Sequence, residues 1–382
     1  MTVLLDDGAS QPGTHVLIIG VGAYAFLKGG KGAEFKHHMS MGQLSSPPES
    51  AAELTEWFLD AADGFHNPDR PLRSLQLLCS SDEEVSWPAP GGGTPVERAT
   101  TANVKKAIAA WVSRASRDED NLALFYFCGH GLSFGQTQNS LLLEGWGENI
   151  LDPMSDALAF DEMRLGLMQQ CKARHQCHFV DACRSIPTKD YREVFGTRTG
   201  EPVVAGGVSS RIRNKIAPVY FATGLASAAY GLDKQPSLFA QGLLLAFRGA
   251  ASRDADDHWD VSVSAMAEGI NKGVESLSLQ TQPQYCQPLE AGQSLLLHRL
   301  RRDPEVIVKV WTRDETLLGK AVLAYTSAAT TLRKEREPRA VPWWVPLPLG
   351  SYDFEALTAD NLANVIGKRT KNIAPPSAEV RL

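Results

Sequence analysis

The chain has 382 residues and a formal net charge of −6; 43% of its residues are hydrophobic and 21% are charged. This composition is typical of ordinary globular proteins with two or three domains, and the acidic balance excludes an overall basic field for nucleic acid. Apolar runs stay well short of the ~20 residues that cross a bilayer. We therefore expect neither a nucleic-acid partner nor a membrane partner.

The N-terminus and the cysteines indicate the compartment. Residues 1–8 carry acid where a signal peptide would place a basic region, which predicts a cytoplasmic location. None of the six cysteines belongs to a Cys-x-x-Cys pair, which disfavours a disulfide scaffold and a zinc ribbon. Cys79, Cys128 and Cys177 lie in or beside apolar runs and are predicted to be small buried hydrophobes.

Short apolar runs alternate with amphipathic stretches over the first 300 residues. The predicted strands are 15–20, 75–79, 122–128, 139–144, 177–181, 219–222 and 294–298. The predicted helices are 50–63, 104–115, 160–172, 237–248 and 263–277, and we expect Thr101 or Asn103 to cap the second. This alternation predicts an α/β fold, with a mostly parallel sheet flanked by helices on both faces.

The pattern changes at residues 299–304. Beyond them, segments 306–311 and 351–356 alternate apolar and polar residues, and prolines and Gly350 punctuate the chain. This is typical of half-buried strands. We predict a first domain over 1–300 and a small β-rich C-terminal domain over 301–382.

Two short motifs carry the chemistry, and each follows a predicted buried strand. The first is Phe-Tyr-Phe-Cys-Gly-His-Gly, residues 125–131, and the second is Phe-Val-Asp-Ala-Cys-Arg-Ser, residues 179–185. The carboxyl ends of parallel strands meet at one sheet edge, where catalytic groups gather. His130 and Cys183 are therefore expected to meet as general base and nucleophile.

In these motifs the chain resembles the caspase-like cysteine peptidases, and their metacaspase-like branch more than animal caspases. Residues 221–230 and 237–245 resemble the strand, substrate loop and helix of the family's small subunit, and 282–284 resemble the element before its last strand. The resemblance implies a large-subunit-like part over about 14–190, a joining loop at about 184–215 and a small-subunit-like part over about 216–298. It therefore implies a caspase-like version of the fold predicted above.

The resemblance also assigns roles. It implies that the backbone N–H groups of Gly131 and Cys183 bind the oxyanion. Asp181 stands where metacaspase-like members carry the aspartate of an S1 pocket for arginine or lysine. It therefore implies cleavage of a protein partner after a basic residue.

Two departures leave the rest of that pocket open. Ser50 stands where the family usually carries an aspartate at the start of the first helix, so Glu49 is a candidate substitute. The acid that often follows residues 229–230 is displaced to Asp233, a second candidate. We expect no cofactor and no metal, although some relatives require calcium and the acidic run 254–257 is open to it; a solvated loop is the favoured interpretation.

The peptidase interpretation has two further parts. Arginines in the loop 184–215 would permit self-cleavage, and we expect the peptidase to be regulated, as enzymes in defence or cell-death signalling are.

Two interpretations from other classes of protein remain. A catalytically idle caspase-like scaffold whose C-terminal domain recruits a regulatory protein is the second interpretation. A small-ligand domain is disfavoured because no phosphate-binding glycine motif follows the first strand.

Overall fold

The computed structural model describes residues 2–88, 93–206, 214–227, 229, 231, 233–278 and 284–382. The chain divides into two compact units. The first comprises Met1–Gln241 and Gln284–Leu295, and the second comprises Gly242–Pro283 and Leu296–Leu382.

The first unit is built on one large sheet with the order β1-β3-β2-β6-β10-β11-β14. Its strands are β1 (Thr2–Asp6), β2 (Thr14–Val21), β3 (Leu72–Ser80), β6 (Leu122–Gly129), β10 (His175–Ala182), β11 (Val219–Phe221) and β14 (Gln287–Leu289). The inner strands are parallel, and the edge strands β1 and β14 are antiparallel to their neighbours. This confirms the predicted mostly parallel sheet.

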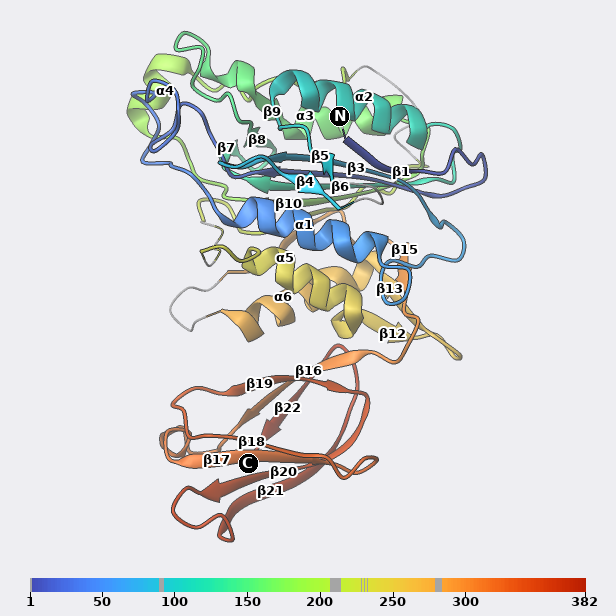
Figure 1. Cartoon of the computed structure of the whole chain (residues 1–382), viewed down its shortest axis with the longest axis vertical. Helices are drawn as coiled ribbons and strands as arrows, with labels where there is room; N and C mark the ends of the chain where they lie inside the picture. The colour runs from blue at the N-terminus through green and yellow to red at the C-terminus, as the bar shows by residue number, and fades with distance from the viewer. Residues whose placement is uncertain are drawn as a thin grey trace. The chain divides into compact units, whose positions relative to one another are not determined.

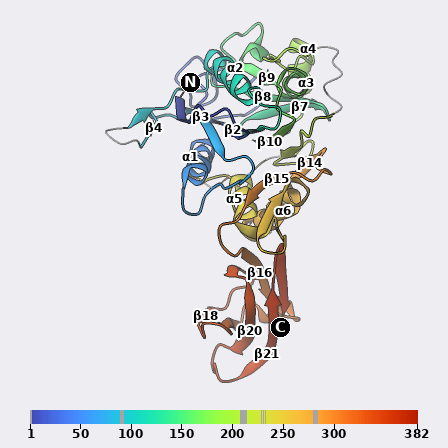
Figure 2. The same cartoon turned by 90° about the vertical axis from the view of Figure 1, so that its right-hand side faces the viewer.

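Helices cover both faces of this sheet, as predicted. They are α1 (Ser46–Leu59), α2 (Thr101–Ala115) and α3 (Phe160–Gln170). Both views show α1 and α2 on opposite faces (Figures 1 and 2), and both helices pack on β2. Because the sheet is covered on both sides, β2 and β6 are buried along their whole length, which explains their continuous apolar sequences. Thr100, and neither Thr101 nor Asn103, caps α2, because its hydroxyl accepts a hydrogen bond from the Asn103 N–H.

Smaller elements complete the first unit. A small sheet orders β7 (Gly131–Gly135), β8 (Gln138–Leu142) and β9 (Ala157–Ala159), and β4 (Ser86–Trp87) pairs with β5 (Thr94–Pro95). A short 3₁₀ helix covers Pro153–Asp156, and α4 (Lys189–Phe195) lies within the predicted joining loop. Helix α5 (Leu238–Leu245) begins in this unit.

The second unit combines helices with three sheets. The continuation of α5 over Ala246–Ala250 and α6 (Val263–Leu277) accompany a sheet of β12 (Ser252–Asp254), β13 (Trp259–Ser262) and β15 (Leu296–Arg299). The acidic run 254–257 forms the end of β12 and the turn toward β13.

The C-terminal residues fold into two further sheets that share a core. One orders β19 (Trp343–Pro348), β16 (Glu305–Trp311) and β22 (Ser377–Arg381); the other orders β18 (Arg333–Arg336), β17 (Ala321–Ser327), β20 (Gly350–Thr358) and β21 (Val365–Ile373). A 3₁₀ turn covers Glu315–Leu317. Val308 and Val380 from the first sheet pack with Leu323 and Phe354 from the second. The predicted β-rich C-terminal region is therefore confirmed.

Candidate active site

His130 lies between the end of β6 and the start of β7 and is held at two points. Its backbone N–H donates to the Tyr24 hydroxyl at 2.7 Å, and its imidazole Nε2 lies 2.8 Å from the Gly42 carbonyl oxygen. A carbonyl only accepts, so Nε2 carries the proton and Nδ1 is left as the basic nitrogen. Burial lowers the pKa of His130, which keeps the imidazole neutral near pH 7.

Cys183 lies one residue beyond β10, the strand next to β6. In the parallel register Ala182 of β10 pairs with Gly129 of β6. Cys183 and His130 are therefore the residues that directly follow this pair on the two neighbouring strands. Both line one cavity of about 320 Å³. The structure therefore brings together the histidine and the cysteine that the two motifs single out, at the carboxyl edge of the sheet.

The Cys183 thiol is half-buried and accepts a hydrogen bond from the main chain. The Ala229 backbone N–H donates to Sγ at 3.2 Å, and burial raises the pKa of the thiol. A thiol of raised pKa is protonated near pH 7, and only its thiolate is a good nucleophile. A neighbouring base is therefore needed for any attack by this cysteine.

Gly131 comes very close to the main chain at Cys183. A Cβ atom at position 131 would lie 2.5 Å from the Cys183 carbonyl oxygen, a separation that only glycine accommodates. Beyond it, the Ser133 N–H donates to the Ser185 carbonyl at 2.8 Å. The residues named as oxyanion donors thus lie on two adjoining segments.

Asp181 is buried, with 2% of its surface exposed, and it lines the same cavity. One of its carboxylate oxygens accepts hydrogen bonds from the Tyr126 hydroxyl at 2.8 Å and from the Ser237 hydroxyl. Burial nevertheless raises the pKa of Asp181. A buried carboxylate with a raised pKa in a cavity is poised to accept a cationic group.

Ser237 lines this cavity and is hydrogen-bonded to Ser50. The Ser237 hydroxyl accepts from the Ala240 N–H at 2.9 Å, which caps α5, while it donates to Asp181. The Ser237 N–H in turn donates to the Ser50 hydroxyl at 2.9 Å. Ser50 is therefore a buried neutral link, through Ser237, to the same carboxylate.

The other two candidate pocket residues are placed differently. Asp233 lines the cavity and accepts a hydrogen bond from the Ser45 hydroxyl at 2.8 Å. Glu49 is exposed on α1 and does not belong to the lining of this cavity. The geometry thus favours Asp233 over Glu49 as a neighbour of Asp181.

The three cysteines that were predicted to be buried are buried, and Cys128 has a further role in lining the cavity. Cys79, Cys128 and Cys177 are 3%, 4% and 0% exposed. Cys128 also lines the cavity, and its thiol is hydrogen-bonded to Asp181. All six cysteines are free.

Several predictions fall on residues outside the described ones: 228, 230, 232, 282, 283 and the arginines at 211 and 213. Within the described part, Arg192 lies in α4 and Arg198 forms ion pairs with Asp152 and Glu201. No described helix is long and apolar enough to cross a membrane. The described residues also hold no group of three or more acidic, histidine or cysteine side chains suited to a metal ion.

The sequence model of the caspase domain family, peptidase family C14, matches residues 14–291. The chain belongs to this family, which confirms the predicted membership of the caspase-like family and the predicted enzyme class, a cysteine peptidase.

Two individual relatives share fewer than a third of their residues with this chain over the matched segments. The chain is 27% identical over 240 residues to an uncharacterized protein of Sinorhizobium fredii, covering 59% of this chain and 67% of that protein. It is 28% identical over 153 residues to a probable protease of a Desulfuromonadales bacterium, covering 39% of this chain and 17% of that longer protein.

Two solved structures are similar. A protein from Geobacter sulfurreducens matches with a TM-score of 0.41 and 14% identity, covering 73% of this chain and 93% of its own. Caspase-1 from Spodoptera frugiperda matches with a TM-score of 0.40 and 10% identity, covering 75% of this chain and 90% of its own.

Proposed function

We propose that this cysteine peptidase cleaves a protein partner after arginine or lysine, with Cys183 as nucleophile and His130 as general base. The observation that carries the proposal is the shared cavity, which His130, Cys183 and Asp181 all line. In the bound complex, the basic side chain before the scissile bond enters the cavity and pairs with Asp181. A guanidinium offsets the cost of burying that carboxylate.

The chemistry follows from the tautomer of His130. Nδ1 takes the Cys183 proton as Sγ attacks the carbonyl carbon, and the N–H groups of Gly131 and Cys183 stabilise the oxyanion. The imidazolium then gives the proton to the leaving amine as the peptide bond breaks. Water, deprotonated by the same imidazole, hydrolyses the thioester and restores the thiol.

Asp233 supplies a second acid at the same cavity in this proposal. Self-cleavage in the loop 184–215 and regulation through a protein bound by the C-terminal domain are part of it, and a defence or cell-death role suits such a regulated peptidase. The described arginines of this loop include Arg192 and Arg198. Arg198 forms ion pairs with Asp152 and Glu201, and Arg192 lies on the short helix α4.

The scaffold alternative is decided by activity. The Ala229 N–H donates to Sγ and opposes the rise that burial causes in the pKa of the thiol, so this contact favours the thiolate. Cys183 also lines the cavity, where a substrate can reach it.

Fluorogenic peptides ending in Arg, Lys or Asp, assayed with and without calcium, test the proposal. The wild-type protein should cleave after Arg and Lys, and Cys183→Ala should be inactive. Cys79→Ala, which removes a buried cysteine outside the cavity, should retain activity. Equal signals from the wild-type and Cys183→Ala proteins would exclude the nucleophile, and cleavage after Asp alone would exclude the role of Asp181. No turnover by a folded wild-type protein would favour the scaffold.

A further inference from the structure

The two contacts that hold His130 come from one segment of the chain. Tyr24 follows β2, and Gly42 precedes α1. Tyr24 holds the histidine backbone, and its ring centroid lies 4.9 Å from that of the imidazole. Gly42 holds Nε2. The position of the imidazole therefore depends on how Tyr24 and Gly42 are fixed relative to each other.

Gln43 makes that connection. Its side-chain Oε1 accepts from the Tyr24 N–H at 2.8 Å, and its Nε2 donates to the Tyr24 carbonyl at 3.0 Å and to the Lys28 carbonyl at 3.1 Å. Both polar atoms of the amide are thus engaged with main chain. Because Gln43 directly follows Gly42, the residue that clamps Tyr24 is joined by one peptide bond to the carbonyl that holds Nε2.

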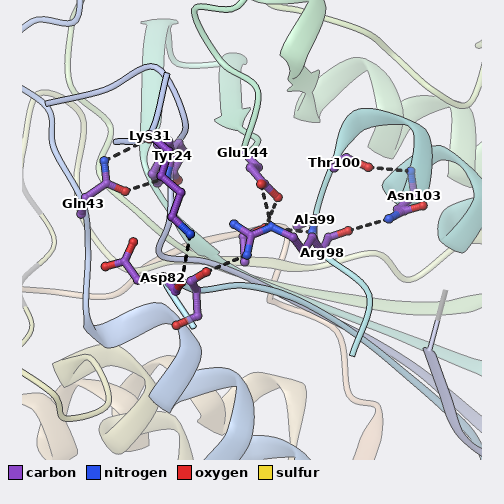
Figure 3. A network of polar contacts seen from close by, with 11 residues as sticks. Tyr24, Lys31, Gln43, Asp82, Arg98, Ala99, Thr100, Asn103 and Glu144 are labelled. Carbon is purple, nitrogen blue, oxygen red and sulfur yellow. Dashed lines mark hydrogen bonds and ion pairs between the residues drawn. The ribbon is translucent and has the colours of Figure 1, made fainter. Parts of the chain in front are cut away.

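The Tyr24 end of this clamp is anchored to the sheet. The N–H groups of Gly22 and Ala23 donate to the Ser80 carbonyl at 2.8 and 3.0 Å, and the Ala25 N–H donates to the Glu144 carbonyl at 3.1 Å. The Glu144 carboxylate is paired with Arg98 at 2.7 Å. Figure 3 shows Gln43 bonded to Tyr24 and the Arg98–Glu144 pair nearby.

We propose that Gln43 is a positioning residue for His130, because its amide locks Tyr24 and the Gly42 carbonyl into one frame that selects the Nε2–H tautomer. The inference rests on the proposed role of His130 as base. The side chain of Gln43 also lines the cavity, so a substrate-binding role is the competing explanation. The two roles differ in their kinetic signature, because loss of positioning lowers kcat whereas loss of substrate contact raises KM.

The test uses Gln43→Met, which keeps the length of the side chain and removes its hydrogen bonds. We expect a roughly tenfold to hundredfold fall in kcat, since small misplacements of catalytic groups have effects of this order, with KM nearly unchanged. The matched control is Gln176→Met. Gln176 is buried whereas Gln43 is half-buried, and the Gln176 amide donates to the Leu167 and Ala173 carbonyls at 3.2 and 3.3 Å, away from the cavity. This control should lose stability without losing kcat.

Tyr24→Phe completes a double-mutant cycle. It removes the hydroxyl that accepts from the His130 N–H and donates to the Leu142 carbonyl at 3.3 Å. If Gln43 and Tyr24 act on one imidazole, the double variant should lose less kcat than the product of the two single losses. Fully multiplicative losses would contradict a shared frame.

A spectroscopic measurement separates this inference from the proposed function. Ring ¹⁵N shifts of His130, assigned by their absence in His130→Asn, report the tautomer in the inactive Cys183→Ala background. We expect the Nε2–H form with Gln43 and a mixture of tautomers in Gln43→Met. An unchanged tautomer, or a rise in KM at unchanged kcat, would overturn the inference. If the wild-type protein shows no peptidase activity, the proposed function fails, and the tautomer measurement alone decides whether Gln43 positions His130.

Discussion

Asp181→Asn is the perturbation that most sharply tests how the cavity selects its substrate. Asn has nearly the shape of Asp, and its oxygen still accepts from the Tyr126 and Ser237 hydroxyls that now bond to Asp181. Only the negative charge is removed. The variant therefore isolates the attraction between this carboxylate and a substrate cation.

The expected loss follows from Coulomb's law. Two unit charges ~4 Å apart attract by about 4 kcal/mol at the effective dielectric constant of ~20 that suits protein sites. Part of this is recovered by hydrogen bonding to Asn, so roughly 3 kcal/mol remains, or ~100-fold in kcat/KM. The loss should appear with arginine before the scissile bond and be absent with norleucine.

Stability should move in the opposite direction. Burial raises the folded-state pKa of Asp181 above its ordinary value, so ionising it at neutral pH costs the native state free energy. Asp181→Asn should therefore unfold at the same or a higher temperature at pH 7. This advantage should shrink as the pH falls through the folded-state pKa, where the native Asp181 becomes protonated.

The assay compares kcat/KM for matched arginine and norleucine peptides, together with thermal unfolding. Asp161→Asn is the control, because Asp161 is a half-buried carboxylate whose pKa is also raised by burial and it lies outside the cavity. It should leave the ratio of the two rates unchanged. Equal losses on both peptides in Asp181→Asn would refute the charge argument.

Other consequences concern pH and the C-terminal sheets. Because burial lowers the pKa of His130 from 6.5, kcat/KM on an arginine peptide should rise along an acidic limb centred below pH 6.5; a limb centred above 7 would contradict this. Burial also lowers the pKa of His15 to about 4, so the unfolded chain binds more protons between pH 6.5 and 4 and the wild type should lose roughly 3 kcal/mol of unfolding free energy there. Urea titrations at pH 7 and 4 should show a smaller loss in His15→Gln, and identical losses would count against it. Phe354→Ala empties a fully buried site in the shared C-terminal core and should lower the free energy of unfolding by about 3–5 kcal/mol; a change under about 1 kcal/mol would show that the core is not packed as described.

The inner part of the fold was readable from sequence because burial dictates composition there. β2 and β6 are covered on both faces, so each is a continuous apolar run bounded by turn residues. The edge strands β1 and β14 were missed. They are short and only partly buried or exposed, so β1 carries just three apolar residues, Val3 to Leu5, and β14 carries neither an apolar run nor a clear alternation.

The sequence predicted the two reactive residues of the site but not the residues that hold them in place. His130 and Cys183 are marked by local motifs at strand ends, and topology brings such ends together. Tyr24, Gly42 and Gln43 contact main-chain groups or contribute one, and they lie far from His130 in sequence, by 106 residues for Tyr24 and 88 for Gly42. No residue pattern encodes a carbonyl as a partner. Ser237 carried a signal as a helix cap, but its second bond to Asp181 depends on tertiary packing.

Covalent labelling tests the central claim most directly. A peptidyl acyloxymethyl ketone with arginine next to the reactive carbonyl would be added to the native protein, and the modified cysteine would be located by peptide mass mapping. We expect one adduct per chain, on Cys183, that is lost in His130→Asn and outcompeted by an arginine peptide but not by an aspartate peptide. Labelling of Cys128 instead, or equal labelling by arginine and aspartate probes, would contradict the assignment of nucleophile and pocket.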